Sequence, residues 1–499
     1  MIKENLNILW IMTDQHRADC LGYAGHSQVQ TPNLDRLARQ GIIFENAFCQ
    51  SPVCMASRAC LMTGRYPAAI RVRGMGILPP TEITLPMTLR RHGFQTAAFG
   101  KVHLTPEQYT SRQLKTDRPV LDWRAFAKDS GFPDLRLDPI AENYGFEHYL
   151  GYEDILPGRF HEWLAEEAPH LLDAAPHRFG GDAPSDLWVS PYPSAYHPTS
   201  FIAKKSAAFI SAQSTDTPWM AFCSFVAPHH PFEAPADQIS KYDLDSIALP
   251  QRKGGVDASR IPGPAADAIS GMDAYDLVTQ KRIVQHYLAS ISLIDDGVGL
   301  LIDALEKSDQ MENTLIVFNS DHGEFLGNHG LLRKPSLHYD ETLRVPLFIR
   351  MPKGKLTPRR EGGLVELTDL YPTLVGLLGI PPHEGVQGRD WSDALRNNGP
   401  VGRENIYADM YDLTPQKFGT RSGPYMAVRT LRTTDWKLTI YPTAGSEYGQ
   451  LFDLRNDPDE ANNLYGNPDH QDVLTELLWQ LLARCHSNTD PLPPCLTQF

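Results

Sequence analysis

The sequence has neither an excess of positive charge nor a long hydrophobic run. Its 499 residues carry 46 Lys and Arg against 60 Asp and Glu, which gives a net charge of -14. A chain that binds nucleic acid needs a basic surface to neutralise phosphates, so we expect no nucleic-acid partner. No apolar stretch reaches the roughly 20 residues that span a bilayer, and no cleavage pattern follows the apolar run at 7–12. These absences predict a cytoplasmic protein without a membrane segment.

Cysteine is also scarce and irregularly spaced. The seven cysteines lie at positions 20, 49, 54, 60, 223, 485 and 495, an odd set that predicts neither a disulfide framework nor a zinc site. Arg58 follows Cys54 too closely, and Arg65 follows Cys60 too closely, for the C-x5-R loop of thiolate phosphatases. No G-x-G-x-x-G follows the first apolar run, which excludes a dinucleotide fingerprint. The chemistry of Cys54 therefore needs another explanation.

The order of apolar and amphipathic segments predicts an α/β fold. Short apolar runs alternate with helical patterns, which favours a large, mostly parallel central sheet flanked by helices. The helix expected at 31–41 has Thr31 as N-cap, Pro32 at its first position and Gly41 after its end. Further helices are expected at 85–93 and 281–307. Strands are expected at 7–12, 94–100, 219–227, 314–320 and 345–350.

Two segments interrupt this alternation, and near the end of the chain the pattern changes to short strands followed by one helix. Residues 105–200 and 251–272 are rich in Pro, Gly or aromatic residues and are expected to be long excursions from the sheet. After the Pro- and Gly-containing stretch at 381–400, short strands lead to an amphipathic helix near 472–485. We therefore divide the chain into a catalytic domain, 1–384, and a C-terminal subdomain, 385–499, with a small antiparallel sheet and one helix.

Polar residues follow four of the expected strands, in the segments TDQ (13–15), KVH (101–103), PHHP (228–231) and DHGE (321–324). Each cluster alone has an ordinary structural explanation as a turn or helix cap. Because ligands bind beyond the carboxyl ends of parallel strands, we expect the four clusters to form one crevice.

This crevice would combine oxygen donors, cations and histidines. Asp14, Gln15, Asp321 and His322 offer oxygen atoms and one imidazole, which favours Ca²⁺ first, then Mg²⁺ or Mn²⁺, over zinc. Lys101 and Lys334 are candidate positive charges for anionic ester oxygens. His103 and His229 can transfer protons near neutral pH. Together these groups suit hydrolysis of a charged ester.

The segment around Cys54 resembles a known signature. CMASR (54–58) followed by ACLMTGR (59–65) is similar to the C-x-P-S-R and T-G-R motif of type I, formylglycine-dependent sulfatases of the alkaline phosphatase superfamily. Other blocks resemble that family in the family's order: TDQHRAD (13–19), TPNLDRLARQG (31–41), GKVH (100–103), APHHPF (227–232), SDHGEFLGNHG (320–330), RVPLFIR (344–350) and LFDLRNDPDEANNL (451–464). The resemblance covers nearly the whole chain.

The resemblance implies a role for each matching residue. Cys54 would be oxidised to formylglycine by a formylglycine-generating enzyme, and the hydrate of that aldehyde would be the nucleophile. With residue 54, the metal ligands would be Asp14, Gln15, Asp321 and His322. Arg58 would steady the hydrate, and Lys101 and Lys334 would hold sulfate oxygens. His103 would be the base that releases sulfate, and His229 the acid that protonates the leaving alcohol.

Three positions depart from the family pattern. Ala56 replaces the common Pro of the signature, Gln15 replaces the second Asp of many members, and Met75 stands where many relatives have Asn. Gln15 lowers the negative charge of the expected metal site by one. None of these changes removes a chemical group that the reaction requires.

Two alternatives to a sulfate ester hydrolase remain. Hydrolysis of a phosphonate monoester or phosphodiester uses the same nucleophile and metal, although the GKVH block favours sulfate. A chain whose Cys54 is never converted would bind a sulfated ligand without turnover. The expected substrate is a small aryl, alkyl or sugar sulfate, and a homo-oligomer is compatible with the sequence.

Overall fold

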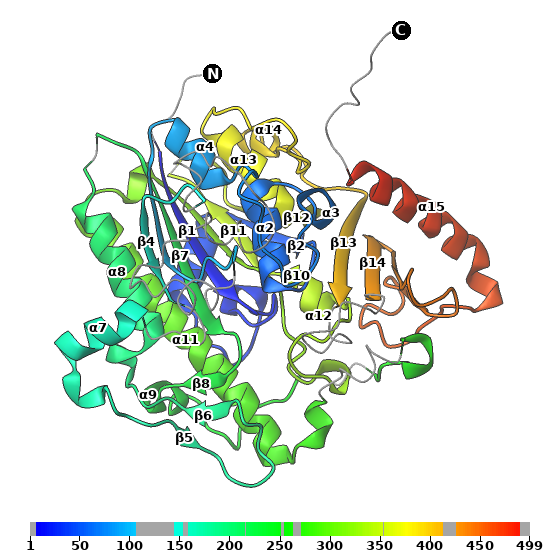
Figure 1. The fold of residues 1–499 in the computed structure, drawn as a ribbon, viewed down its shortest axis with the longest axis horizontal. Helices are drawn as coiled ribbons and strands as arrows, with labels where there is room; N and C mark the ends of the chain where they lie inside the picture. Colours follow the sequence, from blue (N-terminus) through cyan, green and yellow to red (C-terminus); the bar gives the residue numbers. More distant parts are fainter. Residues whose placement is uncertain are drawn as a thin grey trace, which may run out of the picture.

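The computed structural model describes residues 6–105, 144–152, 158–214, 216–250, 254–262, 271–352, 354–412 and 426–489. Figure 1 shows a large sheet with helices on both faces, and a smaller sheet beside it that is covered by the outer helix α15. Within the described ranges, no helix combines the length and apolar character needed to cross a bilayer. The α/β architecture expected from the sequence is confirmed.

The central sheet has the strand order β10-β2-β11-β9-β1-β7-β3-β4, with β12 paired to β2. Its parallel part consists of β9 (Thr314–Ser320), β1 (Asn7–Asp14), β7 (Trp219–Pro228), β3 (Gln95–Gly100) and β4 (His148–Gly151). The antiparallel part places β11 (Leu347–Arg350) between β9 and β2 (Ile42–Phe48), with β10 (Arg344–Val345) at the edge; β12 (Arg359–Glu366) runs parallel to β2. All eight residues of β1 are buried, as a strand covered on both faces requires.

Alternate side chains of β1 enter two different hydrophobic clusters, because successive residues of a strand point to opposite faces. Ile8, Trp10 and Met12 join the cluster formed with α2 (Cys54–Thr63), α4 (Leu85–Arg91) and α13 (Leu370–Leu377). Leu9 and Ile11 join the cluster formed with α1 (Pro32–Arg39), α8 (Pro198–Ala212) and α11 (Leu277–Lys307). These two layers hold the central strands rigidly, so their carboxyl ends are fixed relative to one another.

Shorter elements surround this core. A small sheet is formed by β5 (His177–Arg178), β6 (Leu187–Val189) and β8 (Phe232–Ala234). The short helices are α3 (Pro67–Ile70), α7 (Gly158–Glu167), α9 (Ala236–Ile239), α12 (Asp340–Leu343) and α14 (Ser392–Arg396). The expected excursion at 105–200 is corrected in part, because β4 pairs with β3 and so belongs to the central sheet. Residues 106–143, 153–157, 251–253 and 263–270 lie outside the described residues.

The C-terminal part is an antiparallel sheet with one helix, as the sequence predicts. The sheet order is β13 (Asn405–Asp412), β14 (Met426–Thr433), β15 (Trp436–Ile440) and β16 (Gly449–Asp453). Helix α15 (Gln471–Ser487) buries Leu474, Leu477 and Leu481 against it. Arg484 of α15 also donates to the buried carboxylate of Glu366 in the central sheet, 2.7 Å away. The division of the chain near residue 385 stays a prediction.

The expected strand at 345–350 is divided into β10 and β11. The expectations also lack β2, β4 and β12 of the central sheet, β13 of the C-terminal sheet and the three short strands β5, β6 and β8. β2 has the sequence IIFENAF, whose polar Glu45 and Asn46 interrupt the apolar run at the side of the sheet where the strand is partly exposed. A short interrupted run of this kind carries a weak strand signal.

Candidate active site

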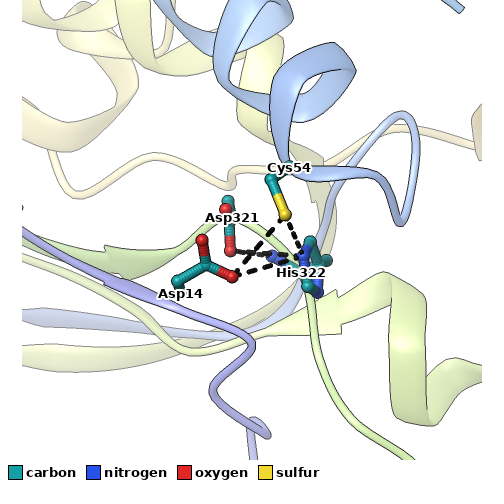
Figure 2. A group of neighbouring side chains, drawn as sticks. All are labelled: Asp14, Cys54, Asp321 and His322. Carbon is teal, nitrogen blue, oxygen red and sulfur yellow. Dashed lines mark hydrogen bonds and ion pairs between the residues drawn. The ribbon is translucent and has the colours of Figure 1, made fainter. Parts of the chain in front are cut away.

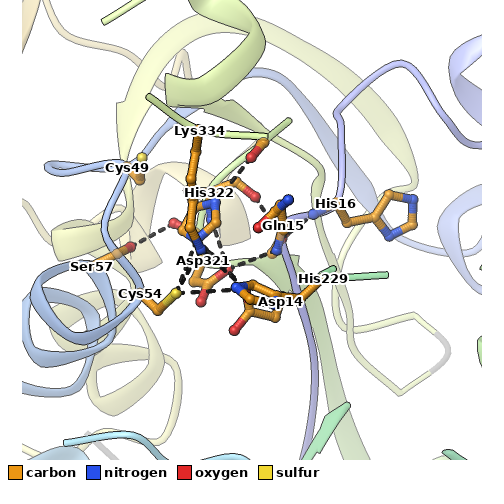
Figure 3. Close-up of polar contacts among 12 residues, drawn as sticks. Asp14, Gln15, His16, Cys49, Cys54, Ser57, His229, Asp321, His322 and Lys334 are labelled. Atoms are coloured by element: carbon orange, nitrogen blue, oxygen red, sulfur yellow. Dashed lines mark hydrogen bonds and ion pairs between the residues drawn. The ribbon is translucent and has the colours of Figure 1, made fainter. Parts of the chain in front are cut away.

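The four polar clusters that follow β9, β1, β7 and β3 come together at one edge of the sheet. These strands are consecutive neighbours in the sheet and run parallel, so their carboxyl ends share that edge. Asp14 ends β1, Lys101 follows β3, His229 follows β7 and Asp321 follows β9. Figure 3 shows Asp14, His229, Asp321 and His322 close together, with Cys54 and Lys334 beside them.

Helix α2 brings Cys54 and Arg58 to this edge. Residues four apart on a helix lie on one face, which explains the spacing of the two residues in the sequence. The guanidinium of Arg58 is fully buried and reaches Asp321 Oδ2 at 2.8 Å through Nε and Asp14 Oδ2 at 3.2 Å through Nη2. Ser57 Oγ donates to the Asp321 carbonyl at 2.6 Å. Helix α2 is therefore tied to the ends of β1 and β9 by buried polar contacts.

Asp14, Cys54, Asp321 and His322 form a buried cluster in which one potential ligand atom from each lies within 4.8 Å of the others (Figure 2). His322 Nε2 is 3.2 Å from Cys54 Sγ and 3.5 Å from Asp14 Oδ1. His322 Nδ1 donates to the Gly323 carbonyl at 2.9 Å, an assignment that leaves the Nε2 lone pair directed into the cluster. This donor set suits a divalent cation.

Gln15 completes the cluster with an amide group. Its backbone is held in the left-handed region, φ 63°, and its N–H donates to Asp321 Oδ1 at 3.1 Å. The side-chain nitrogen Nε2 donates to Glu324 Oε2. The side-chain oxygen Oε1 is buried and accepts no hydrogen bond within the described part of the chain. A buried carbonyl oxygen without a partner is costly, and a bound cation would satisfy it.

Two lysines place positive charge around Cys54. Lys101 Nζ is 2.9 Å from Asp14 Oδ2, and Lys334 Nζ is 2.9 Å from Cys54 Sγ and 2.8 Å from His322 Nε2. Burial alone would raise the pKa of Asp14, but the charges led by Lys101 hold that pKa well below its ordinary value. Burial and the Asp14 charge raise the pKa of Cys54 to about 11, so the unmodified thiol is protonated at neutral pH. A simple thiolate nucleophile is thereby disfavoured.

His103 and His229 lie in the electrostatic field of these groups. Burial, followed by the charge of Lys101, lowers the pKa of His103 well below its ordinary value. Burial, followed by the charge of Lys334, does the same to the pKa of His229. His229 Nδ1 donates to the His230 carbonyl, so Nε2 is the atom that gains and loses a proton. Both imidazoles are neutral at pH 7 in this state of the protein.

Two further buried residues contact the cluster and were not among the predicted site residues. Ser224 on β7 accepts a hydrogen bond from Arg58 Nη1 at 3.0 Å. Glu324 accepts from Gln15 and follows His322 by two positions. Ser224 lies within an apolar strand sequence that gives no signal of a polar role. Glu324 is the last residue of the DHGE segment, so its position directly after the expected strand was a signal for a site residue.

Comparison with known proteins shows the family of this chain. The family described as Sulfatase matches residues 6–380, and the family described as N-sulphoglucosamine sulphohydrolase, C-terminal, matches residues 327–487. An arylsulfatase from Clostridium perfringens is 28% identical over 94% of this chain and 92% of its own length. An ulvan-active sulfatase from Formosa agariphila is 28% identical over 94% of this chain and 79% of its own length.

A solved phosphonate monoester hydrolase from Silicibacter pomeroyi has the same fold. Its TM-score is 0.77 and its sequence is 25% identical, with 97% of this chain and 96% of that chain covered. The shared fold therefore includes hydrolases named for two different ester classes. Because the Sulfatase family matches well over half of the residues, the chain belongs to the sulfatase family of sulfuric ester hydrolases, within the alkaline phosphatase superfamily.

Proposed function

We propose that this enzyme hydrolyses a small aryl, alkyl or sugar sulfate monoester to an alcohol and inorganic sulfate. In this proposal Cys54 is converted to formylglycine by a formylglycine-generating enzyme, and the hydrate of that residue is the nucleophile. The raised pKa of the Cys54 thiol argues against the alternative of an unmodified thiolate nucleophile at neutral pH.

The residues at the cluster fit a divalent cation, with Ca²⁺ first and Mg²⁺ or Mn²⁺ next. Asp14, Asp321, His322 and the Gln15 carbonyl would hold it together with residue 54. Three observations support this assignment: the short separations of the ligand atoms, the tautomer of His322 and the unpartnered Gln15 oxygen. When bound, the cation would polarise the nucleophile and the ester oxygens.

The pair of lysines around Cys54 is the observation that carries the choice of ester. A sulfate monoester has three non-bridging oxygens, whereas a phosphonate monoester has two and places carbon at the third position. Lys101, which contacts Asp14, and Lys334, which contacts Cys54, would together with the cation offer one positive partner for each of three oxygens. Carbon in place of the third oxygen would leave one of these three groups without an oxygen to bind on the substrate, so the phosphonate loses one interaction that the sulfate makes.

The two histidines supply proton transfer. His103 is neutral in the free enzyme and can accept a proton from the hydrate as sulfate is released. His229 must donate a proton to the departing alcohol oxygen. The lowering of its pKa by Lys334 is opposed once an anionic sulfate lies beside that lysine, so substrate binding favours the protonated form of His229.

The test compares turnover of 4-nitrophenyl sulfate with turnover of a 4-nitrophenyl phosphonate monoester by the same purified enzyme. Peptide mass measures the fraction of Cys54 that is converted, and Cys54→Ala is the inactive control. We expect a higher kcat/KM for the sulfate and no turnover by the control. A higher kcat/KM for the phosphonate would support the second candidate, which the fold of the Silicibacter pomeroyi hydrolase favours. High conversion without turnover of either ester would support a binding role.

A further inference from the structure

Glu324 is a fully buried carboxylate just beyond β9, and within the described residues its side chain accepts three hydrogen bonds, all from N–H groups. Oε1 accepts from the backbone N–H of Leu326, at 2.8 Å, and from that of Arg333. Oε2 accepts from the side chain of Gln15. Burial raises the pKa of Glu324, and these hydrogen bonds oppose that effect. The loop N–H groups therefore occupy one carboxylate oxygen and leave the other facing Gln15.

The contacts of Gln15 determine which end of its amide faces the cluster. Both Glu324 oxygens face N–H groups, two of them backbone donors that can only donate, so the carboxyl group acts as an acceptor and selects the nitrogen end of the amide. His230 Nδ1 lies 3.3 Å from the same nitrogen. An amide nitrogen only donates, so this contact makes His230 Nδ1 the acceptor. Both amide N–H groups thus have acceptors outside the cluster.

The carbonyl end of the Gln15 side chain therefore faces the cluster. Its oxygen is buried and accepts no hydrogen bond within the described residues, while its backbone N–H is held by Asp321 at 3.1 Å. Figure 3 shows Gln15 beside Asp321 and His322. If the amide were reversed, its oxygen would face the Glu324 carboxylate and its nitrogen would face the cation, and both contacts would be repulsive.

We infer that Glu324 is a positioning residue that aims the Gln15 carbonyl oxygen at the divalent cation. The inference rests on the cation site of the proposed function. It also explains how an amide can stand where many sulfatases have a carboxylate: Gln15 contributes a neutral ligand, and Glu324 holds that ligand in one orientation. The carboxylate acts through Gln15 and does not itself contact the cation.

The test measures cation binding to the full-length enzyme after removal of divalent ions, by calorimetric titration with Ca²⁺ and, separately, Mn²⁺. In Glu324→Gln the backbone N–H groups of Leu326 and Arg333 would hold the new amide oxygen, so its nitrogen would face Gln15 and favour the reversed orientation of that amide. We expect about 10- to 100-fold weaker binding, the usual effect of losing a group that orients a ligand. Glu82→Gln, which alters a buried carboxylate bonded to Arg65, is the matched control and should leave binding unchanged.

Two further variants separate positioning from loss of a nearby negative charge. Glu324→Asp keeps the charge but is too short to reach both Gln15 and the loop, so it should also weaken binding; it serves as the test if Glu324→Gln does not fold. In a Gln15→Ala background, Glu324→Gln should cause less than about a twofold further loss, because residues that act through one another are not additive.

Three outcomes would overturn the inference. The first is wild-type affinity in Glu324→Gln or Glu324→Asp. The second is a full additional loss in the Gln15→Ala background, which would mean that Glu324 acts as a remote charge. The third is absence of cation binding by the wild-type enzyme, in which case the proposed function fails as well. Binding is measured without substrate, so failure to find the natural ester does not affect the result.

Discussion

At the scale of single residues, Ser224 links two parts of the active site. Its hydroxyl accepts from Arg58 Nη1 at 3.0 Å, and its carbonyl accepts from the N–H of Lys101 at 3.0 Å. The strand β3 approaches so closely here that a Cβ on Gly100, whose φ is 88°, would lie 1.9 Å from that carbonyl oxygen. Only glycine fits at this position. Ser224 therefore helps to place both a guanidinium and a lysine that the proposed reaction uses.

Ser224→Ala should lower kcat/KM by about tenfold, because one buried hydrogen bond to a charged donor is worth ~1.5 kcal/mol. The midpoint of thermal unfolding should change little, since Arg58 keeps its contacts with Asp14 and Asp321. Steady-state kinetics and a thermal melt of the same preparation measure the two effects. Ser206→Ala is the control: Ser206 is equally buried, but its hydroxyl donates to the Ile202 carbonyl within α8. Equal kinetic losses in both variants would contradict a positioning role for Ser224.

At the scale of elements, the segment that carries Lys334 is held by the small sheet of β5, β6 and β8. Arg333 adopts a positive φ of 64°, and its guanidinium binds both carboxylate oxygens of Asp186, directly before β6. The Asp186 carbonyl accepts from the N–H of Phe232 in β8 at 2.7 Å. One ion pair thus joins a peripheral sheet to the residue that precedes Lys334.

Asp186→Asn should raise KM for the sulfate ester about 3- to 10-fold with a smaller change in kcat. The substitution weakens the ion pair with Arg333 and so loosens the neighbouring Lys334. Lys334 would bind the sulfate group in the ground state as well as in the transition state, so its displacement raises KM more than it lowers kcat. Initial rates over a range of substrate concentration measure both parameters. Glu306→Gln, which breaks the exposed ion pair with Arg36, is the control and should leave KM unchanged. A loss of thermal stability with an unchanged KM would mean that the Asp186 ion pair serves stability alone.

At the scale of the whole molecule, the segment before α12 meets the C-terminal sheet through buried polar groups. His338 precedes α12, and its Nδ1 contacts Thr430 Oγ1 of the C-terminal sheet at 2.8 Å. Burial, with a smaller effect of Lys437, lowers the pKa of His338 to about 3. An unfolded histidine has a pKa of about 6.5. Between these two values the unfolded chain binds a proton that the folded chain does not, so the free energy of unfolding falls as the pH falls from about 6.5 towards 3.

His338→Gln should reduce this loss of stability by up to about 1.4 kcal/mol per pH unit within that window. Urea unfolding midpoints at several pH values between 4 and 6.5 give the slope for each protein. The buried His16 and His286, whose pKa values burial lowers to about 4, should leave part of the slope in the variant. Replacement of the exposed His170 by Gln is the control and should leave the slope as in the wild type. An unchanged slope in His338→Gln would show that this histidine is not buried in its neutral form.

The sequence by itself determined the features that depend on local pattern and chain order. Short apolar runs predicted the parallel strands β1, β3, β7 and β9, and polar residues directly after those runs predicted which edge of the sheet carries chemistry. Helix α2, whose single turn accounts for the four-residue spacing of Cys54 and Arg58, is absent from those predictions. The strand predictions succeed because a strand end is set by neighbours in the chain, and the chemistry at that edge stays a prediction.

Only the tertiary structure decided how side chains from different elements contact one another. Gln15 and Glu324 are 309 positions apart, and Arg58 and Ser224 are 166 apart, so neither pair leaves a pattern in a single sequence. The orientation of the Gln15 amide depends on a carboxylate from the segment after β9 and on a histidine from the segment after β7. Such orientations arise when packed strands bring donors and acceptors into a buried space without water, where each polar group must find its partner in the protein.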